Sequence, residues 1–474
     1  MKMKFITIAL CCIPLLLLSS CSKFLEVEPK SSVSDQKLYA DEVGFKQGLT
    51  GIYVSMASQQ LYGDNLTMGV VSAMAQNYNL TSINTLYNSS NFLYANNAYT
   101  RDIWNKGYFT IATINNMLSY IDAKKSVFTG DNYALIKGEA LGLRAYLHFD
   151  LLRLFGSQDI NASGKAIPYR LNFNTVSEPA LTIQENCELI LKDLDDAVTL
   201  LKNDPIMEGN VSRKYRMNHY AVLATKARVL QYLGKSLEAK QLAEEIIKSG
   251  IFTFVKPAAI TTTDVKIKDR LFSDELIFAI RVFDMERWVK TGVGVGKVYF
   301  YESSLPSNRL FRSIANYRTL FESTVAVETK DYRFKNLIEI DGATYFTSKY
   351  WQTWAGATGT NRLDQTVPLF RMSELYYMMA EGATTIEESL AHLNTVRRNR
   401  GLINDLSTQK INTKELLRAE ITKEYLKEFY AEGQTFYYYK RIGATNMLFK
   451  SAQITPQNYQ VTIPDAELEF NPSY

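Results

Sequence analysis

The stretch that decides the fold is MNHYAVLATKARVLQYLGKSLEAKQLAEEIIKS, which spans residues 217–249. Ala221, Ala224 and Ala227 form a stripe of small side chains at helical spacing, so that another helix can approach closely there. After Gly234, apolar residues resume at helical spacing at positions 237, 239, 242, 243, 246 and 247. The stretch therefore predicts two helices that are joined by a turn at the glycine and packed together as a hairpin.

This predicted hairpin resembles one unit of a helical repeat. A glycine at the turn with an alanine five residues later, as at Gly234 and Ala239, is typical of a tetratricopeptide repeat. A second helical hairpin is predicted at residues 372–384 and 388–396, but the spacing between the two hairpins is irregular. We therefore expect an array of helix pairs that wraps into a globule rather than an open solenoid.

Three further helices are predicted upstream. Residues 99–121 and 134–155 carry apolar side chains at helical spacing, and Gly156 follows the second segment where a C-cap glycine belongs. Thr182 and Glu185 form a capping box that opens the third helix. Together these segments predict a mostly α fold with a tetratricopeptide-like scaffold of helical hairpins.

Between residues 251 and 367, apolar residues no longer recur at helical spacing, and we interpret this region as an irregular, loop-rich lobe. Asp341 and Gly342 stand there between two β-like runs, and this pair is a strong signal for a small β-hairpin. A second loop-rich stretch, residues 63–97, is dense in Asn, Thr, Ser and Tyr. We expect both regions to be binding surfaces that the helical scaffold holds in place.

The N-terminus predicts export and lipidation. Lys2 and Lys4 precede an apolar run, residues 5–18, which ends at Leu-Ser-Ser-Cys21. This is the pattern of a secretory signal, and the cysteine resembles the acylated residue of bacterial lipoproteins; a plain signal peptide with an incidental cysteine is the alternative. Acylation at Cys21 would anchor the protein to a membrane without spanning it. The predicted regions are a signal peptide (1–20), a lipidated tether (21–45), an N-terminal helical region (46–250), the irregular lobe (251–367) and a C-terminal helical region (368–474).

Composition and motifs exclude several function classes. The formal net charge of the 474 residues is only +4, which is too small for a nucleic-acid-binding footprint. Of four cysteines, only Cys187 remains in the body, so neither an internal disulfide nor a cysteine zinc cluster can form. The sequence has no His-Glu-x-x-His and no Gly-x-Ser-x-Gly motif. We therefore expect no enzyme, no metal site and no cofactor, although a glycosidase pair of carboxylates formed at long range stays open.

Aromatic residues in the two loop-rich regions are the candidate ligand contacts. The chain has 30 Tyr and 24 Phe but only 4 Trp. Flat rings with polar tips suit the apolar face of a sugar, and Asn, Asp and Arg suit its hydroxyls. The candidates are Trp288, Tyr301, Trp351 and Trp354 in the lobe and Asn77, Tyr78 and Tyr94 in the first loop region. The alternative is that these side chains pack the core, as expected for Trp104 on its helical stripe.

Several short motifs, each present once, follow one another along the chain in a recognisable order. They are the opening Cys21-Ser-Lys-Phe-Leu-Glu-Val-Glu-Pro29, Leu143-Arg-Ala-Tyr-Leu-His-Phe149 with Arg153-Leu-Phe-Gly156 and Ile167-Pro168, the 221–243 segment, Asp274-Glu-Leu-Ile-Phe278, Arg371-Met-Ser-Glu-Leu-Tyr-Tyr-Met-Met-Ala-Glu381, Leu393-Asn-Thr-Val-Arg-Arg-Asn-Arg-Gly401 and Val461-Thr-Ile-Pro-Asp-Ala-Glu-Leu468 with Asn471-Pro472. As a set, they resemble the SusD/RagB family of outer-membrane nutrient-binding lipoproteins. The run Glu432-Gly-Gln-Thr-Phe436 departs from the family pattern, which marks a divergent member.

The resemblance implies a function as well as a fold. Members sit as a lid over a TonB-dependent, SusC-like transporter, facing the cell exterior, and deliver oligosaccharides without catalysing a reaction. The expected partners are therefore that transporter, an oligosaccharide and the membrane. Two alternatives stay open: a peptide ligand, as in RagB-type uptake, or a repeat scaffold that binds no small ligand.

Overall fold

The computed structural model describes residues 34–264, 267–283, 285, 310–326, 328–341, 344–350 and 363–474. It is 54% helix and 6% strand, so the prediction of a mostly α fold is confirmed. The longer helices are α3 (Glu42–Met56), α6 (Ala98–Ile121), α7 (Asn132–Phe155), α8 (Ile183–Leu200), α9 (His219–Tyr232), α10 (Ser236–Lys248), α15 (Met372–Glu381), α16 (Ile386–Arg398), α17 (Lys414–Glu428) and α18 (Gln434–Arg441).

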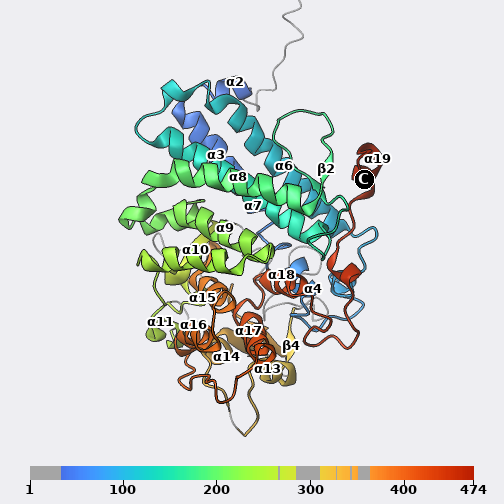
Figure 1. The fold of residues 1–474 in the computed structure, drawn as a ribbon, viewed down its shortest axis with the longest axis vertical. Helices are drawn as coiled ribbons and strands as arrows, with labels where there is room; N and C mark the ends of the chain where they lie inside the picture. Colours follow the sequence, from blue (N-terminus) through green and yellow to red (C-terminus); the bar gives the residue numbers. More distant parts are fainter. Residues whose placement is uncertain are drawn as a thin grey trace, which may run out of the picture.

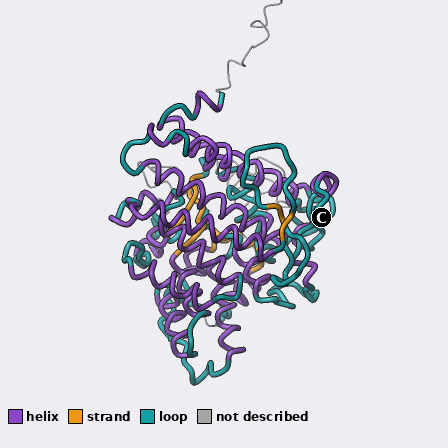
Figure 2. The backbone as a smooth tube through the Cα atoms, turned by 45° about the horizontal axis from the view of Figure 1, so that its top comes forward, coloured by secondary structure: helices purple, strands orange, loops and turns teal. Residues whose placement is uncertain are grey.

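Short helices and strands complete the fold. The short helices are α2 (Asp35–Leu38), α4 (Val70–Met74), α5 (Tyr87–Ser90), α11 (Pro257–Thr261), α13 (Ile314–Leu320), α14 (Tyr332–Leu337) and α19 (Asp465–Phe470). The strands are β1 (Ile167–Pro168), β2 (Ala180–Leu181), β3 (Leu276–Arg281), β4 (Arg312–Ser313), β5 (Ile338–Asp341), β6 (Thr344–Thr347) and β7 (Thr366–Arg371). Figure 2 shows these strands as short pieces among the helices.

The predicted hairpin at residues 217–249 is the pair α9–α10, and Gly234 between them adopts a left-handed φ of +76°. The alanine stripe of α9 is buried, as expected for a close helix contact. Helices α6, α7, α8, α9, α10, α15 and α16 pack each on the next (Figure 1). The two predicted hairpins are therefore neighbours in space. Helix α10 of the first hairpin packs against α15 of the second, although residues 249–371 separate the two helices in sequence.

The ends of two helices refine the predictions. Gly156 is the C-cap of α7, but its φ of −69° and ψ of 164° are extended rather than left-handed. The glycine is required there for space instead, because a Cβ would lie 2.7 Å from the carbonyl oxygen of Leu152. The capping box of α8 is confirmed: Thr182 Oγ1 accepts from the Glu185 N–H, and the Glu185 carboxylate accepts from the Thr182 N–H.

Replacing Thr182 with alanine is expected to lower the free energy of unfolding by about 1 kcal/mol, because the first turn of α8 loses its side-chain acceptor. Urea unfolding followed by circular dichroism measures this loss. The matched control is Thr199→Ala, which removes an exposed threonine from the same helix and leaves stability nearly unchanged. Equal losses in the two variants would contradict a capping role for Thr182.

The predicted β-hairpin is also confirmed. β5 pairs antiparallel with β6, with Asp341 opposite Thr344, and β4 extends this sheet on the other side of β6. A second antiparallel pair, β3 with β7, was not predicted from the sequence. It joins residues nearly a hundred positions apart, and no turn signal marks such a pairing. This pair joins residues 276–281 of the irregular lobe to the C-terminal end of the lobe.

The core is one large cluster of apolar side chains along the helix stack, with a smaller cluster around Tyr377, Leu393 and Tyr425 in the C-terminal helices. Trp104 is 4% exposed and packs edge-on against Phe155, so its prediction as a core residue is confirmed. Across the residues that the structure describes, no helix combines the length and apolarity needed to cross a bilayer.

Candidate functional site

A cavity of about 520 Å³ lies where the first loop region meets the irregular lobe and the C-terminal segment. Most of its wall is made of polar and aromatic side chains. The lining residues are Gln76, Tyr78, Asn79, Leu80, Tyr87, Ser90, Asn91, Phe92, Arg312, Asn316, Phe449, Lys450, Ser451, Ala452, Gln453, Ile454 and Asn458. The two loop-rich regions that the sequence predicted as binding surfaces thus contribute to one site.

Hydrogen bonds that involve backbone groups join the two loop regions to each other at this cavity. The Asn79 N–H donates to the carbonyl oxygen of Phe311 over 2.8 Å. The Asn77 carbonyl oxygen accepts from Arg312 Nε over 2.8 Å, and its side-chain oxygen accepts from the Ala431 N–H over 3.0 Å. Asn77 therefore joins the first loop region both to β4 and to the loop before α18.

The structure gives the three candidates of the first loop region different positions. Tyr78 lines the cavity, but it is only 5% exposed and its hydroxyl donates to the Met68 carbonyl oxygen. Asn77 and Tyr94 are buried beside the cavity, and the Tyr94 hydroxyl donates to the carbonyl oxygen of Asn458, a lining residue. Asn77 and Tyr94 thus support the wall from behind. Direct contact of these three side chains with a ligand stays a prediction.

The other candidates, Trp288, Tyr301, Trp351 and Trp354, lie outside the described residues, as does the predicted lipidation site Cys21.

The sequence analysis did not single out several side chains of the cavity. Two are aromatic: Phe92 and Phe449. Five carry carboxamides, namely Gln76, Asn91, Asn316, Gln453 and Asn458. Tyr87 and Asn79 also line the cavity and offer the ring and carboxamide chemistry that the sequence predicted for the first loop region. The high Asn content of residues 63–97 was a usable signal for part of this set. Nothing in the pattern of residues 449–458 or around Arg312 marked them, because only the tertiary fold brings them to the cavity.

The electrostatics of the cavity are set by two cations. Burial lowers the pKa of Arg312, and burial also lowers the pKa of Lys450. The Arg312 guanidinium lies over the Phe449 ring at 4.0 Å, and the Lys450 ammonium lies over the Phe92 ring at 5.4 Å. The rings therefore face cations on the cavity wall as well as open space.

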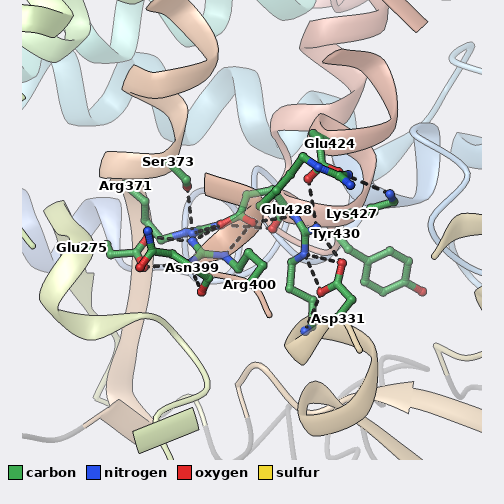
Figure 3. A network of polar contacts seen from close by, with 12 residues as sticks. Glu275, Asp331, Arg371, Ser373, Asn399, Arg400, Glu424, Lys427, Glu428 and Tyr430 are labelled. Carbon is green, nitrogen blue, oxygen red and sulfur yellow. Dashed lines mark hydrogen bonds and ion pairs between the residues drawn. The ribbon is translucent and has the colours of Figure 1, made fainter. Parts of the chain in front are cut away.

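A buried ion network holds the base of the irregular lobe (Figure 3). The Lys349 ammonium donates to the carbonyl oxygens of Glu428 and Tyr430 and to the Glu432 carboxylate. The guanidinium of Arg371, on β7, donates to the carboxylates of both Glu428 and Glu432. Lys349, which follows β6, thus forms an ion pair with Glu432 in the loop between α17 and α18. The same loop contacts Asn77 through Ala431.

Two carboxylates of this network, Glu424 and Glu428, stay ionised because cations surround them. Burial alone would raise the pKa of Glu424, but Lys427, Arg333 and Arg397 outweigh it and lower the pKa to about 2. Glu428 accepts from three arginines, and its pKa is likewise held well below the usual range. None of these groups is among the described residues that line the cavity, so the network supports the site rather than contacting a ligand.

A larger cavity, of about 980 Å³, lies between α13, α17 and residues 442–449. Its walls are mainly helix faces, and among the described lining residues it has a single carboxamide, Asn446. Its exposed wall is mainly apolar, whereas that of the smaller cavity is mainly polar, so it suits a hydroxyl-rich ligand less well. For this reason we consider the smaller cavity the candidate site.

Two family models match the chain. One is described as "Starch-binding associating with outer membrane" and matches residues 23–233, and the model of the SusD family matches residues 342–471. The chain belongs to the SusD family. This membership confirms the predicted family and places the protein among the carbohydrate-binding proteins associated with the outer membrane. Because the family consists of binding proteins, the prediction that the chain is not an enzyme is confirmed as well.

Similar proteins support the assignment over the whole length of this SusD-family protein. It is 24% identical to SusD-like protein P38 of Formosa agariphila, with both chains fully covered. A SusD superfamily structure from Bacteroides vulgatus matches with a TM-score of 0.72 and 19% identity, over 91% of this chain and 97% of the other. A second structure from that species, described as a SusD-like carbohydrate binding protein, matches with a TM-score of 0.69 and 18% identity over the same shares. These structures establish the fold.

Proposed function

We propose that this SusD-family protein is a lipid-anchored receptor that binds an oligosaccharide at the cell surface and passes it to a TonB-dependent, SusC-like transporter. The observation that carries the proposal is the cavity of about 520 Å³, whose wall combines three partly covered rings with six carboxamides. A SusD-like carbohydrate binding protein among the similar structures supports the same ligand class.

The wall chemistry matches what an oligosaccharide needs. Each sugar ring has a face of C–H groups, which packs against an aromatic ring, and a rim of hydroxyls, which both donate and accept hydrogen bonds. A carboxamide also donates from its nitrogen and accepts at its oxygen, so one Asn or Gln can satisfy neighbouring hydroxyls. Tyr87, Phe92 and Phe449 would supply the apolar surface, and the carboxamides of the wall would fix the orientation.

The aromatic candidates of the lobe belong to the same proposal. Trp288 and Tyr301 precede β4, which reaches the cavity through Arg312, and Trp351 and Trp354 follow Tyr350. The Tyr350 hydroxyl donates to the carbonyl oxygen of Ala431, the residue whose N–H donates to Asn77. We propose that these four residues extend the ligand surface beyond the described part of the cavity.

Anchoring and delivery complete the proposed mechanism. Acylation at Cys21 would hold the protein at the outer membrane, with its cavity facing the cell exterior. The helical hairpins would supply the surface that docks on the transporter, because they form a rigid stack apart from the cavity residues. Capture at the cavity would then raise the ligand concentration at the transporter entrance.

Titration calorimetry of the purified protein with oligosaccharides chosen from a glycan array tests this function. Trp288→Ala, Trp351→Ala and Tyr87→Ala are each expected to weaken binding about tenfold, because each removes a stacking ring. Phe173→Ala is the matched control, since Phe173 is 54% exposed and does not line the cavity.

Three outcomes decide between the functions. Binding of oligosaccharides that the ring variants weaken supports the proposal. Binding of peptides instead would establish a peptide-uptake subunit, and binding of neither class would favour a repeat scaffold. Unchanged glycan affinity in all three variants would remove the assigned site but keep the function.

A further inference from the structure

One buried arginine differs from all the others that the structure describes. Nine arginines are buried there, and eight of them lie within ion-pair distance of a carboxylate: Arg144, Arg153, Arg228, Arg270, Arg333, Arg371, Arg397 and Arg400. Among the described residues, Arg312 is 1% exposed and has no such partner. Its guanidinium donates from Nε to the Asn77 carbonyl oxygen, lies within hydrogen-bonding reach of the Tyr430 hydroxyl and covers the Phe449 ring. These partners are neutral and do not use all five N–H donors, so the described residues give this buried cation no counter-charge.

The second cation of the cavity has the same property. The Lys450 ammonium donates to the Ser90 carbonyl oxygen over 3.2 Å and to the Asn91 side-chain oxygen over 2.6 Å. Both acceptors are neutral. Lys450 directly follows Phe449, whose ring the Arg312 guanidinium covers, so both cations belong to one side of the cavity.

In the part of the cavity wall that the structure describes, no acidic side chain offsets these charges. Among its seventeen described lining residues there is no Asp and no Glu, although the chain as a whole has 49. A buried charge without a partner destabilises a protein, and a bound ion of opposite sign removes that penalty. A ligand with hydroxyls only would hydrogen-bond to the carboxamides but would leave the two charges uncompensated.

We propose that the cavity selects an anionic oligosaccharide, with Arg312 and Lys450 as the counter-charges of an acidic group on the sugar. This inference rests on the proposed glycan-binding function and specifies its ligand class. The acidic group is a uronate carboxylate or a sulfate ester, because both present paired oxygens to the planar fork of an arginine. Arg312, whose guanidinium lies over the Phe449 ring, would supply directional hydrogen bonds, and Lys450 would supply a second, more accessible charge.

The test compares matched acidic and neutral ligands by titration calorimetry. One pair is a uronic-acid oligosaccharide and its carboxyl-reduced form, and the other is a sulfated oligosaccharide and its desulfated form. We expect the preferred acidic member to bind at least about tenfold more tightly than its neutral counterpart, and this preference to shrink as salt is raised. The pair that shows the preference identifies the acidic group.

Substitutions of Lys450 and Arg312 test whether these two residues cause the preference for the acidic ligand. Lys450→Gln and Arg312→Gln are each expected to weaken binding of the acidic ligand about tenfold while changing the affinity for its neutral form by less than about twofold. Lys450 is only partly buried, so its variant keeps the test valid if Arg312→Gln fails to fold. Lys410→Gln, which removes an exposed lysine outside the cavity, is the matched control and leaves both affinities unchanged.

The two proposals fail in different ways. Equal affinity for acidic and neutral members of both pairs would overturn the anionic preference while the glycan-binding function stands. A preference that neither cavity variant alters would overturn the assignment to Arg312 and Lys450. Absence of binding to any oligosaccharide, acidic or neutral, would overturn both this inference and the function beneath it.

Discussion

Replacing Glu428 with glutamine is expected to lower the free energy of unfolding by about 3–5 kcal/mol, the largest loss that we predict for this protein. Glu428 is fully buried at the centre of the ion network. One carboxylate oxygen accepts from Arg371 and, over 2.7 Å, from Arg400. The other accepts from Arg400 over 3.0 Å and from Arg333 over 2.9 Å.

The size of this effect follows from what remains after the substitution. Glutamine keeps the shape of the side chain, but it removes the negative charge and turns an N–H₂ group toward arginine donors. Three buried guanidinium groups would then share fewer acceptors, and the penalty of an uncompensated buried charge exceeds the value of the lost hydrogen bonds. The loss is therefore electrostatic and not a packing defect.

Urea unfolding of the wild-type protein and of the Glu428→Gln variant measures the effect. The control is Glu238→Gln, because Glu238 and its partner Lys235 are both more than half exposed and lie 3.9 Å apart. An exposed pair of this kind contributes less than about 1 kcal/mol. A loss below about 1 kcal/mol for Glu428→Gln as well would show that the network does not stabilise the fold.

Gly433→Ala is expected to destabilise the protein by about 3 kcal/mol, for two separate reasons. Gly433 has a left-handed φ of +77°, which costs an alanine about 1–2 kcal/mol. In addition, a Cβ at this position would lie 2.2 Å from the carbonyl oxygen of Leu66 and 3.0 Å from Thr67 Cα, and such a clash adds about 1–3 kcal/mol. The close approach places the start of α18 directly against the first loop region.

A second glycine separates these two contributions. Gly209 has a similar φ of +88°, but no atom lies within 4 Å of the position that a Cβ would take. Gly209→Ala should therefore lower the free energy of unfolding only by the cost of the left-handed backbone. Thermal or urea unfolding measures the loss in both variants, and the difference between the two losses is the contribution of the clash at Gly433. Equal losses in the two variants would mean that the loop at Leu66 moves aside without cost.

Local sequence patterns were sufficient for the helices and the hairpin. Apolar residues at helical spacing predicted α6, α7, α9 and α10 to within a few residues. The pattern was sufficient even for α7 and α9, which are buried on nearly all sides. The capping box at Thr182 and the hairpin between β5 and β6 were also predictable, since both depend on neighbouring residues alone, although Asp341 lies in β5, where it pairs with Thr344. The density of Asn and Tyr in residues 63–97 likewise pointed to one side of the candidate site.

Contacts between distant segments were decided only by the tertiary structure. The pairing of β3 with β7, the charges that meet at Glu428 and the unpaired Arg312 all depend on which segments the helix stack brings together. A charged residue looks the same in sequence whether it is solvated, paired in the core or exposed to a cavity. Only the fold assigns its partner, and because no described carboxylate pairs with Arg312, we expect an acidic ligand there.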